Sequence, residues 1–253
     1  MSIKQHIPNA ITCGNLLCGC VAVVQTFEGN LVMASYLIGI AAILDFLDGF
    51  AARQLNVHSK IGKDLDSLAD MVTFGLVPGL IIHRMLSIGY LVNHQAYEII
   101  ASNQWMVYIP LIIPIQSAIR LAKFNNDTRQ AEAFIGVPTP ANAILIGSIP
   151  LIVHWDTQFD LKHCEFIHFL IHPYSLLILS VVMAFLLVAE LPLFSLKFKK
   201  FGWKGNEIRY VFLALSLIGI IIFQYLGLAI AIVLYVALSV INNMFFKAKP
   251  QSN

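Results

Sequence analysis

The sequence predicts an all-α protein, a polytopic transmembrane helical bundle of about eight spans. Of its 253 residues, 58% are hydrophobic and 12% are charged, whereas an average soluble domain has about 25% charged residues. The apolar residues form segments that are each close to the roughly 17–25 residues needed to cross a bilayer about 30 Å thick. Basic residues gather in every second connection between these segments, as expected for membrane helices of alternating direction.

The first three spans are defined by their apolar runs and by the residues that bound them. Pro8 suits the start of the first span. No small-residue cleavage site follows that run, so we expect it to remain as a span rather than to be removed. Arg53 ends the second span, and the loop that enters the third span carries Gly62.

The later spans complete a bundle without a soluble module or an internal repeat. The fourth ends near Arg120, and a tight turn near Gly227 separates the last two. We expect one membrane domain over residues 1–200 and an additional C-terminal hairpin over residues 201–253 in the same bundle. The expected spans are 9–27, 31–53, 68–90, 106–125, 139–155, 173–194, 209–225 and 227–246.

The basic residues set the expected orientation. With both termini in the cytoplasm, only Arg84 and Lys162 of the 16 lysines and arginines fall on the opposite side, which is the positive-inside pattern. We therefore expect a multi-pass protein of the cell (inner) membrane, with the end of the second span and the start of the third facing the cytoplasm. The net charge of +2 is too small to indicate a nucleic-acid partner.

Four aspartates at that cytoplasmic end are the most informative residues of the chain. Asp45, Asp48, Asp66 and Asp70 are the acidic positions of D-x-x-D-G-x-x-A-R and, eight residues later, G-x-x-x-D-x-x-x-D. Spacings of three and four residues place each pair on one helix face. A carboxylate in the centre of a bilayer helix costs roughly 2.5–3.5 kcal/mol, and two of them about 5 Å apart repel by roughly 3 kcal/mol at an effective dielectric of about 20. Folding does not require such a cluster, so we expect it to bind metal ions.

The chemistry of the cluster favours hard divalent cations. Carboxylate oxygens select Mg²⁺ or Mn²⁺ rather than zinc, and two such ions could clamp a phosphate or pyrophosphate group. Gly49, Ala52 and Gly62 leave room for a ligand beside the backbone. Arg53 supplies a fixed cation suited to phosphate or to a cluster aspartate.

Two other interpretations of the aspartates are open from the residues alone. Intramembrane carboxylates also form proton or cation relays, so an ion or solute transporter is a rival function. Charged side chains at helix ends can also extend to the interface without a ligand, although lysine and arginine do this more often than aspartate. The glycine and arginine positions inside the motif argue against the transporter, as does the lack of matching Gly or Pro breaks in the two halves.

The complete motif resembles the signature of the CDP-alcohol phosphatidyltransferases, and all eight fixed positions match. Members of that family are membrane enzymes with a six-helix core that often dimerise. They transfer the phosphatidyl group of a CDP-linked lipid to an alcohol and release CMP. The resemblance implies metal ligands at Asp45, Asp48 and Asp66. It implies that Asp70 is a ligand of a second metal or the general base, that the small motif residues line the nucleotide pocket, and that the protein is a homodimer.

Further segments resemble the phosphatidylserine synthase subgroup of that family. They are residues 7–19, 120–125 and 134–141, with a weaker likeness over 193–199. The resemblance implies CDP-diacylglycerol and L-serine as substrates, with direct attack of the serine hydroxyl on the lipid-linked phosphate. Glycerol 3-phosphate or an inositol phosphate as the acceptor is the alternative within the family.

A serine pocket should contain a cation and hydrogen-bonding partners, because serine carries a carboxylate and an ammonium group. An arginine fork matches a carboxylate with two parallel hydrogen bonds. Arg120, Lys123 and Asn125 lie at the depth of the aspartates, and we expect them to bind serine, although a basic helix end also acts as a membrane anchor.

Polar residues near the start of the chain complete the candidate site. An amide inside a membrane span is costly unless it is hydrogen-bonded, so Asn15 is unlike a packing residue. We expect Asn9, Thr12 and Asn15 to contact the head group of the CDP-lipid.

Overall fold

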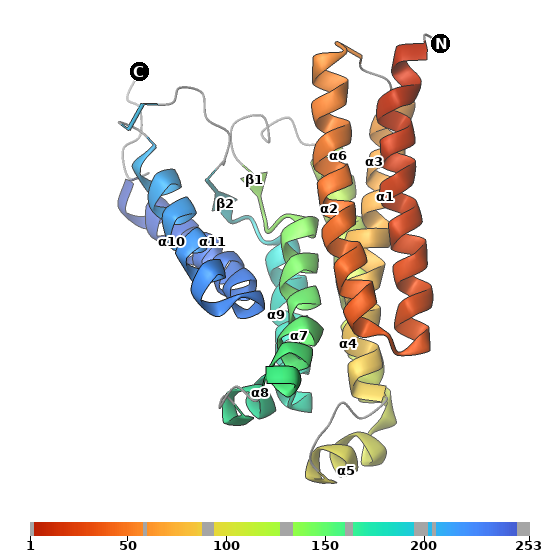
Figure 1. Ribbon diagram of the computed structural model, residues 1–253, viewed down its shortest axis with the longest axis vertical. Helices are drawn as coiled ribbons and strands as arrows, with labels where there is room; N and C mark the ends of the chain where they lie inside the picture. The colour runs from red at the N-terminus through yellow and green to blue at the C-terminus, as the bar shows by residue number, and fades with distance from the viewer. Residues whose placement is uncertain are drawn as a thin grey trace.

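The computed structural model describes residues 3–57, 60–87, 94–126, 134–159, 164–194, 202–203 and 206–246. Nearly all of these residues are helical (Figure 1), and the predicted all-α bundle is confirmed. The elements are α1 (Ile3–Glu28), α2 (Leu31–Gln54), α3 (Lys60–Asp70), the π-helix η1 (Met71–Leu76), α4 (Val77–Ser87), α5 (His94–Ser102), the 3-10 helix η2 (Gln104–Leu111), α6 (Ile112–Asn126), β1 (Phe134–Ile135), α7 (Thr139–Phe159), α8 (Cys164–Leu170), α9 (Pro173–Val188), β2 (Pro192–Leu193), α10 (Glu207–Phe223) and α11 (Tyr225–Phe246).

Five helical segments of the described chain are long and apolar enough to cross a membrane, and α7 and α9 are shorter apolar helices. Together with α10, these segments correspond to the eight predicted spans. The five long segments are His6–Glu28, Leu31–Gln54, Ile61–Ser87, Gln104–Asn126 and Tyr225–Asn243.

Two predicted boundaries were wrong. The third span was expected to begin at residue 68, but its helix begins at Lys60. The sequence of α3 is polar along one side, so hydropathy does not reveal its first two turns. The sixth span was expected to extend to residue 194, but α9 ends at Val188, and the chain continues into the short strand β2, which begins at Pro192. The predicted residues 88–90 of the third span lie outside the described residues.

The N-terminal helices form a tightly packed half of the bundle. The helices α1 and α2 are joined by a turn in which the Asn30 side chain caps α2 by accepting a hydrogen bond from the backbone N–H of Met33 at 3.2 Å. Both helices, together with η1, α4 and α7, contribute to one apolar core. At Gly19 of α1, a β-carbon would collide with the side chain of Thr73 in η1. The absence of a side chain there lets α1 and η1 approach each other closely.

The C-terminal hairpin of α10 and α11 packs beside α7 (Figure 1). A second apolar core joins it to the rest of the molecule, with the rings of Phe212 and Tyr235 against Met183. The Tyr235 hydroxyl donates to the backbone oxygen of Phe194 at 2.9 Å. Strand β2, just before Phe194, pairs with β1, so the hairpin also holds the segment that enters α7.

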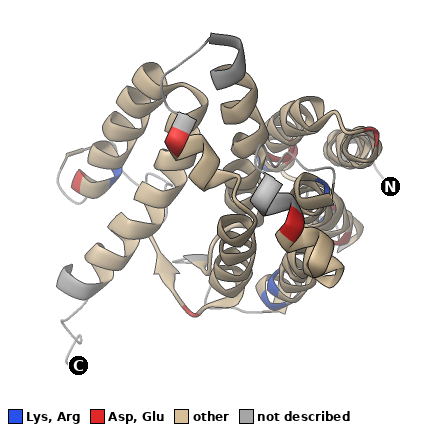
Figure 2. Ribbon diagram, turned by 90° about the horizontal axis from the view of Figure 1, so that it is seen from below, with Lys and Arg blue, Asp and Glu red and all other residues tan. Residues whose placement is uncertain are grey.

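The outer surface is apolar, as a membrane protein requires. Many large apolar side chains are exposed, including Leu17, Phe46, Ile178 and Ile221. In Figure 2 most of the described helical ribbon is tan, and the red and blue segments that mark charged residues are few. In Figure 1 the start of α1 and the end of α11 lie toward one end of the bundle, with α5 and α8, two short helices that the sequence did not indicate, toward the other.

Candidate metal centre and active site

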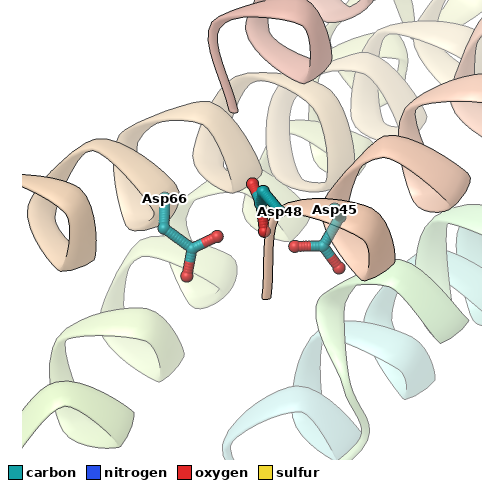
Figure 3. Close-up of side chains that lie close together, drawn as sticks. All are labelled: Asp45, Asp48 and Asp66. Atoms are coloured by element: carbon teal, nitrogen blue, oxygen red, sulfur yellow. The ribbon is translucent and has the colours of Figure 1, made fainter. Parts of the chain in front are cut away.

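Three of the four predicted aspartates meet between α2 and α3. One carboxylate oxygen from each of Asp45, Asp48 and Asp66 can be chosen so that all three lie within 4.8 Å of one another. In Figure 3, Asp66 projects from one side and Asp45 from the other, with Asp48 between them. Asp48 is buried, and the other two are half-buried. The three-residue spacing on α2 places its two carboxylates on one face, as the sequence predicted.

Asp70 lies in the same region but outside that group of three. It is 8% exposed and is the last residue of α3, directly before the π-helix η1. Its carboxylate is close enough to those of Asp45 and Asp66 for their charges to interact. Its Oδ1 accepts a hydrogen bond from the Asn15 amide at 3.3 Å. The fourth carboxylate is therefore held by α1, apart from the other three.

The donor set suits a divalent metal ion. Three anions within 4.8 Å repel one another by about 3 kcal/mol per pair at an effective dielectric of about 20. Among the described residues, Arg120 is the only buried basic side chain, so the protein itself supplies little compensation. The group contains only carboxylates and no described histidine or cysteine, which favours a hard cation. These residues could hold a metal ion, and the metal prediction is supported to that extent.

The polar residues of α1 contact the aspartates directly. The Thr12 hydroxyl donates to Oδ2 of Asp48 at 2.6 Å, and Asn15 donates to Asp70. The backbone oxygen of Asn15 in turn accepts a hydrogen bond from the Thr73 hydroxyl at 3.2 Å. Asn9, one turn earlier, is half-buried. In this structure Thr12 and Asn15 bind carboxylates, and their predicted contact with a lipid head group stays a prediction.

The small residues of the motif are partly accessible. Gly49 and Ala52 are half-buried on α2, and Arg53 is exposed at its end. A β-carbon at Gly49 would lie 3.4 Å from a guanidinium nitrogen of Arg53, so Arg53 folds back over this face. Gly62 is half-buried on α3. The structure leaves the nucleotide-binding role of these four residues as a prediction.

The three predicted serine-binding residues have different surroundings. Arg120 is 7% exposed, its guanidinium carbon lies 5.8 Å from the centre of the Phe124 ring, and its charge interacts with that of Asp70. Lys123 is exposed. The Asn125 amide donates to the Ser67 hydroxyl at 2.8 Å, linking α6 to α3 next to a cluster aspartate. Only Arg120 is enclosed near the carboxylates.

Sequence reasoning missed buried polar residues on α6 and α7, two helices that pack against η1. Ser117, Thr139 and Asn142 are fully buried, and their side-chain polar atoms have no hydrogen-bond partner among the described residues. Thr139 falls inside the segment that resembles phosphatidylserine synthases, whereas Asn142 lies one residue beyond it. Thr73 was also missed, because its role depends on the close approach of α1 and η1.

A family model and several named proteins match this sequence. The sequence model of the family described as CDP-alcohol phosphatidyltransferase matches residues 5–190. The chain therefore belongs to the CDP-alcohol phosphatidyltransferase family, and it is a membrane-bound transferase of phospholipid synthesis.

Named relatives within that family are similar over much of the chain. The chain is 31% identical over 246 residues to the CDP-diacylglycerol–serine O-phosphatidyltransferase of Helicobacter pylori, covering 96% of this chain and 92% of the relative. It is 36% identical over 136 residues to the enzyme of the same name from Bacillus subtilis, covering 54% of this chain and 70% of the relative. It is also 29% identical over 148 residues to the archaetidylserine synthase of Methanothermobacter thermautotrophicus, covering 57% of this chain and 58% of the relative.

Proposed function

We propose that this protein transfers the phosphatidyl group of CDP-diacylglycerol to the hydroxyl of L-serine, giving phosphatidylserine and CMP. The observation that carries the proposal is Arg120, a buried guanidinium whose charge interacts with Asp70 and whose Nε has no partner among the described residues. A buried cation in that position suits the carboxylate of an amino-acid acceptor. The names of the Helicobacter pylori and Bacillus subtilis relatives support serine as that acceptor.

The residues divide the chemistry between them. Asp45, Asp48 and Asp66 would hold the metal ions, and Arg120 orients the serine carboxylate. Asp70, which the Asn15 amide holds in place, takes the proton of the serine hydroxyl as its oxygen attacks phosphorus and CMP leaves. This direct attack forms no covalent intermediate with the protein, so it needs no nucleophilic side chain.

Metal identity and number are part of the proposal. We propose Mg²⁺ or Mn²⁺, with two ions in each site. When bound, such ions neutralise the charge that develops on the phosphate oxygens. Carboxylate ligands suit both metals.

The placement of the enzyme follows from its charges. Arg53, Lys63 and Lys123 are exposed at the end of the bundle where the aspartates lie. We propose that this end faces the cytoplasm of a cell with the protein in its inner membrane, because basic residues stay on that side. We also propose that residues 1–200 form the catalytic domain, that residues 201–253 belong to the same bundle, and that two copies form a homodimer.

The proposal is tested by following CMP release from CDP-diacylglycerol by the purified protein in detergent. Serine is compared with ethanolamine, which lacks the carboxylate, and with glycerol 3-phosphate and inositol phosphate. We expect serine to be preferred, and we expect Arg120→Gln to reduce the preference for serine over ethanolamine. Release with glycerol 3-phosphate but not with serine would assign a different acceptor, and no release with any alcohol would favour the transporter.

A further inference from the structure

Two buried polar side chains at the start of α7 lack partners. The hydroxyl of Thr139 and both polar atoms of Asn142 have no hydrogen-bond partner among the described residues, and both residues are 0% exposed. Their three-residue spacing places them on one face of α7. Buried amides and hydroxyls are nearly always hydrogen-bonded in native proteins. These two therefore indicate a bound ligand.

A matching pair lies on α6, where Ser117 Oγ and Arg120 Nε are also buried without a partner among the described residues. Asn15 Oδ1 on α1 is a further such atom. The three helices that carry these residues all pack against η1, which begins directly after Asp70. The unpartnered atoms therefore belong to the three helices that surround the proposed base.

Most such atoms of the described residues lie on these three helices, and Arg84 Nε on α4 and Ser216 Oγ on α10 are the others. Further along α7, the buried Ser148 donates to the backbone oxygen of Leu145 at 2.6 Å. On α9, the buried Ser180 donates to the backbone oxygen of Leu176 at 2.7 Å. These two hydroxyls are satisfied within their own helices, whereas those of Thr139 and Ser117 are not. Thr139 could have been an apolar residue of the same shape if packing were its only role.

We propose that Thr139 and Asn142 bind the ammonium group of the serine acceptor and determine the specificity for an amino acid. The inference rests on the proposed function, in which Arg120 receives the carboxylate. An ammonium group has three donors and no acceptor, and the Thr139 hydroxyl and the Asn142 carbonyl supply neutral acceptors for it. Neutral acceptors bind the ammonium without adding a further anion beside the aspartates.

The test uses Thr139→Val and Asn142→Leu, which remove the polar atoms while keeping most of the side-chain volume. Initial rates of CMP release are measured with serine and with 3-hydroxypropanoate, which is serine without the ammonium group. We expect the KM for serine to rise by about tenfold or more, as for loss of a hydrogen bond to a charged group. The rate with 3-hydroxypropanoate and the KM for CDP-diacylglycerol should stay within about twofold, so that the preference for serine narrows.

The melting temperature in detergent provides a second readout. Because each variant removes an unpartnered buried group, we expect both to be as stable as the wild type or more stable. Ser148→Ala, on the same helix, is the matched control, and its ratio of serine to 3-hydroxypropanoate rates should not change. A fall in melting temperature together with loss of activity on both acceptors would assign Asn142 to packing.

Two results would overturn the inference. Unchanged kinetics with a raised melting temperature would mean that water fills this region and that serine does not reach it. An equal rise in KM for serine and for 3-hydroxypropanoate would show that Thr139 and Asn142 do not contact the ammonium group. Failure of the proposed function is recognised separately, because the wild-type protein would then release no CMP with serine.

Discussion

The hydroxyl of Thr12 on α1 donates a 2.6 Å hydrogen bond to Oδ2 of Asp48 on α2. This bond crosses between helices and fixes one of the three carboxylates that could hold a metal. A residue that orients a metal ligand usually contributes 10–100-fold, as an order of magnitude, to metal affinity or activity. We therefore expect Thr12 to act as a positioning residue for the proposed metal centre.

Thr12→Val should weaken metal activation without unfolding the bundle. We expect the metal concentration for half-maximal CMP release to rise by about 10-fold or more, because Asp48 loses the bond that orients it. Thr26→Val is the control, since Thr26 is buried on the same helix but bonds to its own backbone, at the oxygen of Ala22. Equal metal dependence of the two variants would contradict a positioning role for Thr12.

Asp70→Asn should abolish transfer while leaving CDP-lipid binding largely intact. The asparagine keeps the shape and can still accept from Asn15, but it cannot take the proton of the acceptor hydroxyl. Loss of a general base lowers the rate by about 10²–10⁴-fold. The measurement is single-turnover CMP release, with binding of CDP-diacylglycerol followed in parallel. Near-normal turnover of this variant would show that Asp70 is not the general base.

Metal removal should destabilise the wild type much more than Asp45→Asn. In chelator, the wild type keeps three mutually repelling carboxylates, each pair costing up to about 3 kcal/mol, so Asp45→Asn should melt at a higher temperature. With Mg²⁺ or Mn²⁺ at about 100 times its Kd, the wild type should gain about 2.7 kcal/mol. The variant should gain much less. Equal metal-induced shifts in melting temperature would show that Asp45 is not a ligand.

The sequence predicted the aspartate cluster better than its surroundings for a physical reason. The spacing between Asp45 and Asp48 is a property of one helix, so it survives into the structure. That Asp66 joins them, while Asp70 is held apart by Asn15, depends on how α1 and α3 pack. Residue spacing carries no information about such packing.

Other features were hidden because they exist only after folding. The first turns of α3 are polar, so the span that contains Lys60 looked shorter than it is. Asn142 gave no signal as a sequence feature, since an asparagine near a proline suits a helix start. Its importance comes from burial without a partner, which only three-dimensional packing reveals.

The close approach of α1 and η1 at Gly19 can be tested by adding one methyl group. In Gly19→Ala the new β-carbon would collide with Thr73, forcing α1 away from η1 and stretching the Asn15–Asp70 bond. Overpacking of this kind lowers the free energy of unfolding by about 1–3 kcal/mol. We also expect a large loss of CMP release in the protein that remains folded, because the displaced helix carries both Thr12 and Asn15.

Gly39→Ala is the matched control. Nothing lies within 4 Å of its added carbon, so this helical position should gain roughly 0.5–1 kcal/mol of stability. Thermal unfolding and CMP release are measured for both variants, and a Gly19→Ala protein with wild-type activity would show that the spacing of α1 and η1 does not set the geometry of the site.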